Sequence, residues 1–97
     1  MATFVALINF TESGMRDIDQ SPRRADAFIA QARSVGIDIK SLYWTTGSHD
    51  GVLIFDAPDD GSAAGLLLSL ARAGNVRTET LRAFDRTEFE TVLSKMT

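Results

Sequence analysis

The stretch VLIFDAPDD, residues 52–60, joins the two elements that decide the fold. Its four large apolar residues occupy both alternating positions of an extended chain. A strand that is apolar at both positions is typical of a central strand that is covered on both faces. The Pro-Asp-Asp run that follows predicts the start of a helix, since negative charge is favourable at a helix N-terminus. We therefore expect a central strand over 52–57, then a helix that ends at Gly74.

The residues before this stretch predict two more strands and one helix. Thr3–Phe10 is also apolar at both positions, which indicates the second central strand. Ser21, as the cap, and a proline in the first turn predict a helix that ends at Gly36. Its apolar stripe leaves the arginines and glutamine of 23–33 on the solvent side. Strand 37–46 changes parity near Lys40-Ser41, which indicates a β-bulge.

Three further segments complete the chain. Thr11–Ser21 is polar and contains a glycine, so we expect a loop. Asn75–Phe84 mixes apolar and charged residues, which is typical of an edge strand. Asp85 and Glu88 match a capping box, and a short amphipathic C-terminal helix is expected after them.

The expected order is βαββαβ with a terminal helix, which is the α+β, ferredoxin-like arrangement with an antiparallel sheet. The 97 residues fit one domain, 1–97. Right-handed crossovers place both main helices on one sheet face. Because the central strands are apolar on both faces, the other face needs a cover. That cover is either the terminal helix, which is too short to do it alone, or the sheet of a second copy in a homodimer or larger homo-oligomer.

Composition excludes several classes of function. The net charge of −3 disfavours binding to nucleic acid. The chain has no cysteine, which removes disulfides and cysteine-held metals and suits a reducing cytoplasm. No secretion signal or membrane span is expected. One histidine without a second histidine or cysteine gives no metal site, and no cofactor is expected.

Three motifs carry a family resemblance: WTTG at 44–47, GSHDGVLIFDAPDD at 47–60 and GNVRTETLRAF at 74–84. Together they resemble the GYD domain family of small bacterial proteins. His49 stands where that family usually has tyrosine. The resemblance implies a dimeric α/β-barrel architecture, in which two ferredoxin-like units join through their sheets. Its relatives include muconolactone isomerases, small monooxygenases and ligand-binding regulatory domains, so fold does not fix function.

Two adjacent residues are the first candidates for chemistry. His49 could act as a general base beside the Asp50 carboxylate. Neighbouring residues of an extended strand point to opposite faces, so this pair needs a turn to meet. The alternative is a polar turn in which Asp50 accepts hydrogen bonds from nearby backbone amides.

Asp56, Trp44 and Arg77 are the other candidates for ligand binding. Asp56 ends a central strand, where it either caps the next turn or faces a pocket. Trp44 either lines a cavity beneath the helices or packs in the core or at the dimer contact. Arg77 belongs to a polar ladder on the edge strand, which either binds an anionic ligand or forms cross-strand and intersubunit pairs.

These observations leave three functional hypotheses. The first is a homo-oligomeric accessory protein or binder of a small, partly apolar organic ligand. The second is a cofactor-independent enzyme, such as an isomerase or a monooxygenase-like protein, acting in a pocket between sheet and helices. The third is a regulatory domain whose assembly responds to a ligand.

Overall fold

The computed structural model describes residues 1–97 and has the expected α+β, ferredoxin-like order. Four antiparallel strands form one sheet in the order β2-β3-β1-β4, so β1 and β3 are central and β4 is at an edge, as predicted. None of the helices has the length and apolar content needed to cross a membrane. The elements are β1 (Ala2–Phe10), α1 (Glu12–Arg16), a 3-10 turn (Ile18–Gln20), α2 (Ser21–Ser34), β2 (Asp38–Trp44), β3 (Gly51–Ala57), α3 (Asp60–Arg72), β4 (Val76–Ala83) and α4 (Arg86–Ser94).

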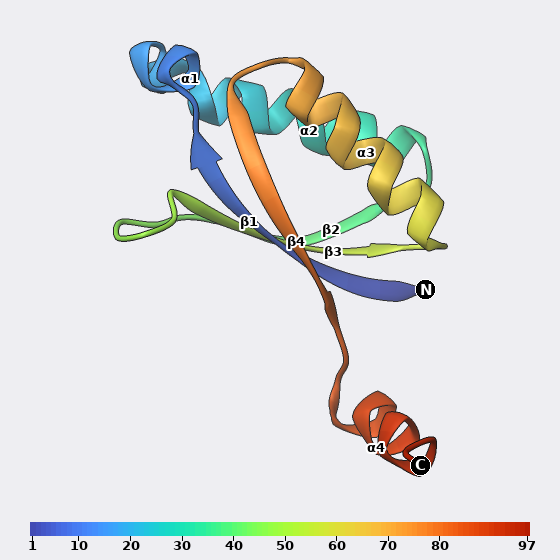
Figure 1. The fold of residues 1–97 in the computed structure, drawn as a ribbon. Helices are drawn as coiled ribbons and strands as arrows, with labels where there is room; N and C mark the ends of the chain where they lie inside the picture. Colours follow the sequence, from blue (N-terminus) through green and yellow to red (C-terminus); the bar gives the residue numbers. More distant parts are fainter.

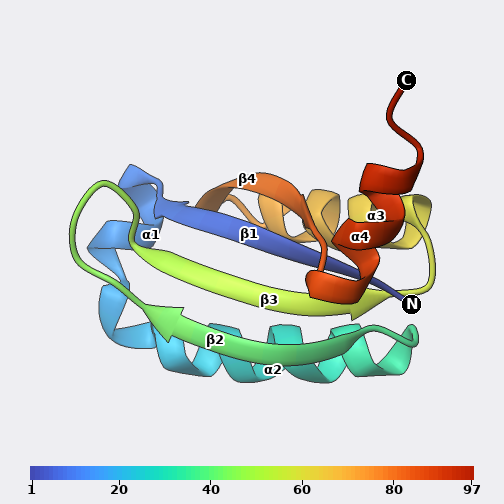
Figure 2. The same ribbon diagram turned by 90° about the horizontal axis from the view of Figure 1, so that it is seen from below.

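Helices α2 and α3 both lie on one face of the sheet, α2 along the β2 edge and α3 toward the β4 edge (Figures 1 and 2). Alternate side chains of β1 and β3 pack beneath them, because successive side chains of a strand point to opposite faces. Phe4 and Phe55 stack there with ring centroids 5.4 Å apart. The core between sheet and helices consists of Phe4, Ala6, Phe28, Ala32, Ile37, Leu53, Phe55, Ala57, Ala63, Leu66 and Leu67.

The pairing of β2 with β3 contains the predicted bulge. Ile39 lies opposite Phe55 and Ser41 lies opposite Ile54, which leaves Lys40 without a partner in the register. The extra residue lets the apolar side chains of β2 stay on the helix side of the sheet despite their change of parity.

The interpretation of Thr11–Ser21 as a loop was wrong, because α1 and the 3-10 turn occupy most of it. The Thr11 hydroxyl caps α1 by accepting a hydrogen bond from the Gly14 N–H at 3.1 Å. Arg16 and Glu12 form an i,i+4 ion pair within this helix. Ser21 is also not the cap of α2: Gln20 holds that position without a side-chain bond.

The second face of the sheet, which we call the open face, carries the other set of alternate side chains. Its apolar residues adjoin one another in the register: Val5 lies opposite Ile54 and Leu81, and Leu7 lies opposite Val52. Tyr43 extends the patch from β2. No helix of the same chain covers this face, because α4 projects away from it near the end where β1 begins and makes no substantial contact with any strand (Figures 1 and 2). Of the two covers considered for this face, the terminal helix is therefore excluded.

Candidate ligand-binding pocket

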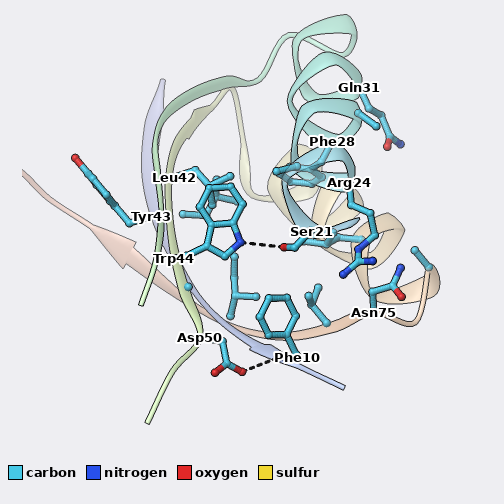
Figure 3. A pocket seen from close by; sticks show the side chains of 18 of the residues that line it. Phe10, Ser21, Arg24, Phe28, Gln31, Leu42, Tyr43, Trp44, Asp50 and Asn75 are labelled. Carbon is cyan, nitrogen blue, oxygen red and sulfur yellow. Dashed lines mark hydrogen bonds between the residues drawn. The ribbon is translucent and has the colours of Figure 1, made fainter. Parts of the chain in front are cut away.

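A pocket of about 370 Å³ lies between the sheet and the two main helices (Figure 3). It forms where β1 and β2 end and where β3 and β4 begin, close to the start of α2 and the end of α3. Its walls are mainly apolar, as is typical of sites for small organic molecules. The apolar residues that line it include Ile8, Phe10, Phe28, Leu42, Leu53, Leu70 and Val76.

Trp44 lines this pocket at the end of β2 and is half-exposed. Its indole N–H donates a hydrogen bond to the Ser21 hydroxyl at 2.9 Å, across from β2 to the first turn of α2. Ser21 is only 8% exposed, so this bond gives a partner to a hydroxyl that water hardly reaches. The bond fixes the plane of the indole and leaves part of the ring free to contact a ligand.

Asp50 also lines the pocket, at the entry to β3. One carboxylate oxygen accepts a hydrogen bond from the Phe10 N–H at 2.9 Å. The Asp50 N–H in turn donates to the Ile8 carbonyl at 2.8 Å. These bonds hold Asp50 against the end of β1, 40 residues away in sequence, and its second carboxylate oxygen makes no hydrogen bond within the chain.

Arg24 and Gln31 line the pocket from α2, although the helical pattern placed them on the solvent side. The Arg24 guanidinium donates to the carbonyl oxygens of Asp17 at 3.0 Å and Gly14 at 3.4 Å. These acceptors lie in the segment 11–21, which the sequence predicts as a loop. Because the sequence does not predict the helical turns of this segment, it gives no reason to place Arg24 beside a cavity. This cationic group was therefore missed.

His49 does not line the pocket. Its Nδ1 lies 2.9 Å from the Asn9 side-chain oxygen, and the Asn9 amide donates to the Ser48 carbonyl at 3.0 Å. These contacts hold the turn before β3 against the end of β1. The structure therefore does not bring the imidazole together with Trp44 at a cavity.

Asp56 lies at the opposite end of β3 from the pocket. It accepts a hydrogen bond from the Thr3 hydroxyl at 2.6 Å and lies 3.6 Å from the Lys40 ammonium. Lys40 also pairs with Asp38 at 3.3 Å. The hydrogen bond to Asp38 and its charge, followed by the charge of Asp56, raise the pKa of Lys40.

Arg77 is exposed on β4 and lies opposite Asn9 in the register, away from the pocket lining. The five candidate residues are therefore divided: Trp44 and Asp50 share one pocket, and the other three lie elsewhere. No cluster of three or more histidine or acidic side chains is placed to hold a metal ion.

The sheet order and the two helices on one face define a ferredoxin-like domain with a pocket between its layers. The chain belongs to the GYD domain family, whose model matches residues 4–93. The resemblance noted from the sequence motifs is thereby confirmed.

One relative and two solved structures show what the chain is similar to. It is 31% identical over 84 residues to the "Glutamine synthetase and cystathionine beta-lyase binding protein" of Thermus thermophilus, covering 86% of this chain and 88% of that protein. The dehydrochlorinase TftG of Burkholderia phenoliruptrix superposes with a TM-score of 0.63 at 15% identity, covering 90% and 97%. MtbAldR superposes with a TM-score of 0.63 at 17% identity over 88% of this chain and only 54% of its own. At such identities the two structures show a shared fold and nothing about activity.

Proposed function

We propose that this protein is a homo-oligomeric binding protein that takes a small, largely apolar organic molecule in the pocket between sheet and helices. The pocket itself carries the proposal: its volume of about 370 Å³ is within the range of small-molecule sites. Aromatic rings of Phe10, Phe28 and Trp44 line it. Asp50 and Arg24 belong to the same lining, and we expect their polar groups to supply the contacts that orient a ligand.

The test is a ligand screen read by the fluorescence of Trp44, the single tryptophan of the chain. A ligand that binds the folded state also raises the melting temperature. Ala25→Phe places a ring in the pocket and should abolish binding, because Ala25 lines it. Ala30→Phe is the matched control, since Ala30 is exposed on the same helix outside the lining. A ligand that binds both variants equally occupies another site and removes this proposal.

The homo-oligomeric part of the proposal rests on the open face. Val5, Leu7, Val52 and Ile54 are only half-buried in the single chain, and Leu81 is exposed. Packing two such faces about 10 Å apart would remove them from water. Ile54→Lys should therefore yield monomers in light scattering, while Ser34→Lys on the exposed side of α2 should not. A wild-type monomer at micromolar concentration would remove this part of the proposal.

Binding to a protein partner is the second candidate. The printed name of the Thermus relative, which is 31% identical to this chain, favours it. The experiment is a binding titration of the purified chain against glutamine synthetase and cystathionine beta-lyase from its own organism. Binding of either enzyme by the Ala25→Phe variant with unchanged affinity would show that the partner surface lies outside the pocket. Failure of both enzymes to bind would remove this candidate.

The enzymatic alternative has less support from the geometry. His49, the residue expected to act as a base, contacts Asn9 and lies outside the pocket lining. Its substitution by alanine should therefore leave any activity of the pocket unchanged. The remaining acid–base group at the pocket is Asp50, and an activity lost on Asp50→Asn without loss of folding would revive the enzymatic hypothesis.

A further inference from the structure

Helix α4 projects from the domain on a short connection after β4. It lies on the open-face side of the sheet, opposite α2 and α3 (Figure 1). It has no substantial packing contact with any other element, and none of its residues is buried. At the start of this connection the Arg82 guanidinium lies 4.4 Å from the centroid of the Phe84 ring and 5.6 Å from that of Phe4.

The sequence of α4 nevertheless specifies a helix with an apolar face. Asp85 accepts a hydrogen bond from the Glu88 N–H at 2.7 Å, and the Glu88 carboxylate accepts one from the Asp85 N–H at 2.9 Å, which completes a capping box. Phe89 and Leu93 are one turn apart and share a face, 50% and 47% exposed. Met96 continues that face just beyond the helix and is also exposed.

A helix of this length needs a partner. Isolated helices shorter than about 12–15 residues are marginal in water, and α4 has 9 residues. α4 does not pack on its own domain, so its apolar face can be buried only against another molecule.

We propose that α4 is an arm whose Phe89–Leu93 face packs on a second copy of this chain. The inference rests on the homo-oligomer proposed above, and it adds α4 to the interface between the two copies. The position of α4 carries it, because a copy that packs against the open face stands on the side of the sheet to which α4 extends (Figures 1 and 2).

The area of the open face also favours a contact between α4 and the second copy. Four strands about 4.8 Å apart and about seven residues long make a face of roughly 19 by 23 Å, so two copies together cover only about 900 Å². Stable protein interfaces bury about 1,200–2,000 Å². The exposed apolar side chains of α4, Phe89 and Leu93, supply further area on that side (Figure 1).

The charges of α4 favour a protein over a membrane as its partner. From its cap Asp85 to Lys95 the segment carries two cations, Arg86 and Lys95, and three carboxylates, Asp85, Glu88 and Glu90. Helices that bind membrane surfaces carry an excess of lysine and arginine on the polar face. Carboxylates outnumber cations in this segment, so an anionic membrane surface does not attract it.

The first experiment uses the absence of cysteine from the natural chain. The full chain carrying Leu93→Cys is labelled with a photo-reactive benzophenone, made in ¹⁴N and ¹⁵N forms, mixed and left to exchange subunits. We expect cross-links that join light to heavy chains. Thr91→Cys, on the opposite side of α4, is the control and should give few. Cross-links confined to one chain, or none from Leu93→Cys, would overturn the proposal.

The second experiment measures self-association by sedimentation. Phe89→Ser with Leu93→Ser should weaken it at least about tenfold, because two apolar side chains no longer leave water on assembly. Thr87→Ser with Thr91→Ser is the matched control on the opposite side of α4 and should change it less than about twofold. A wild-type dimer that the first pair leaves unchanged refutes the arm while assembly through the open face stands. A monomeric wild type refutes both. Ligand binding in the pocket is scored separately in either case.

Discussion

Replacing Gly14 by alanine tests whether the segment between β1 and α2 is held by close packing. A Cβ atom at Gly14 would lie 1.9 Å from the backbone oxygen of Asn75 and 2.8 Å from its carbonyl carbon. Both atoms belong to the backbone, so no side-chain rotation relieves the overlap. Since non-bonded carbon contacts lie near 3.5–4.0 Å, the Asn75 carbonyl or the whole of α1 has to move by more than about 1 Å.

The movement breaks contacts that tie this segment to the start of β4. The Thr11 N–H donates to the Asn75 carbonyl at 3.0 Å, and the Thr11 hydroxyl donates to the Gly74 carbonyl at 2.6 Å. Each hydrogen bond contributes about 1 kcal/mol, and overpacking costs about 1–3 kcal/mol. The expected loss in the free energy of unfolding for Gly14→Ala is therefore about 3–5 kcal/mol, which lowers the Tm of a domain this size by more than about 10 °C.

Urea unfolding at one fixed protein concentration measures this loss, since assembly makes stability depend on concentration. Gly65→Ala is the matched control, because Gly65 lies within α3 and its new methyl group meets no atom within 4 Å. That variant should gain about 0.5–1 kcal/mol from reduced backbone entropy in the unfolded chain. A Gly14→Ala protein within about 0.5 kcal/mol of the wild type would refute the close approach of α1 to Asn75.

Three further predictions concern stability. Leu53→Ala should cost about 2–5 kcal/mol in urea unfolding, because Leu53 is fully buried, whereas exposed Leu68→Ala should cost less than about 0.5. Trp44→Phe should cost about 1 kcal/mol by removing the donor to the Ser21 hydroxyl, and an unchanged midpoint would contradict that contribution. Asp59 caps α3 by accepting a hydrogen bond from the Ser62 N–H at 2.7 Å, and this bond lowers the pKa of Asp59 from 3.8. The cap therefore stabilises the fold fully above that pH, and the stabilisation is lost as the pH falls through the lower pKa of the folded state. Asp59→Ala should therefore be less stable than the wild type at pH 6, with a difference that closes below pH 3.8; a constant difference would contradict this.

The main strands and helices could be predicted because their signals are local. Apolar residues at both alternating positions identified β1 and β3 as central, and the parity change at Lys40 identified the bulge. The family motifs overlap these same strands, so pattern and resemblance agree on the fold.

Helix α1 could not be predicted because its support comes from distant residues. Its polar sequence has no apolar stripe, and the neighbours that hold it in place, Gly74 and Asn75, follow it by about 60 residues. The position of Arg24 depends on this helix through the Gly14 carbonyl. One missed local structure therefore also hid a cationic group of the pocket.

The candidate site was only partly predicted, since residue type does not tell where a cavity forms. Trp44 and Asp50 line the pocket because β2 ends and β3 begins at the same edge of the sheet. His49 precedes Asp50 directly, yet its ring contacts Asn9 instead. Adjacent residues of a turn can therefore differ in role: Asp50 lines the cavity, whereas His49 holds the turn against the end of β1.

The alternation of side chains along β3 makes ligand binding and assembly separable. Leu53 faces the pocket, while its neighbours Val52 and Ile54 lie on the open face. A substitution at 54 should therefore change the oligomeric state without altering the pocket lining, and one at Ala25 should do the reverse. If a ligand of the pocket nevertheless shifts the oligomeric state, its effect has to pass through the backbone of the central strands. Comparing ligand affinity between the wild type and Ile54→Lys measures that coupling directly, because linkage requires it to be equal in both directions.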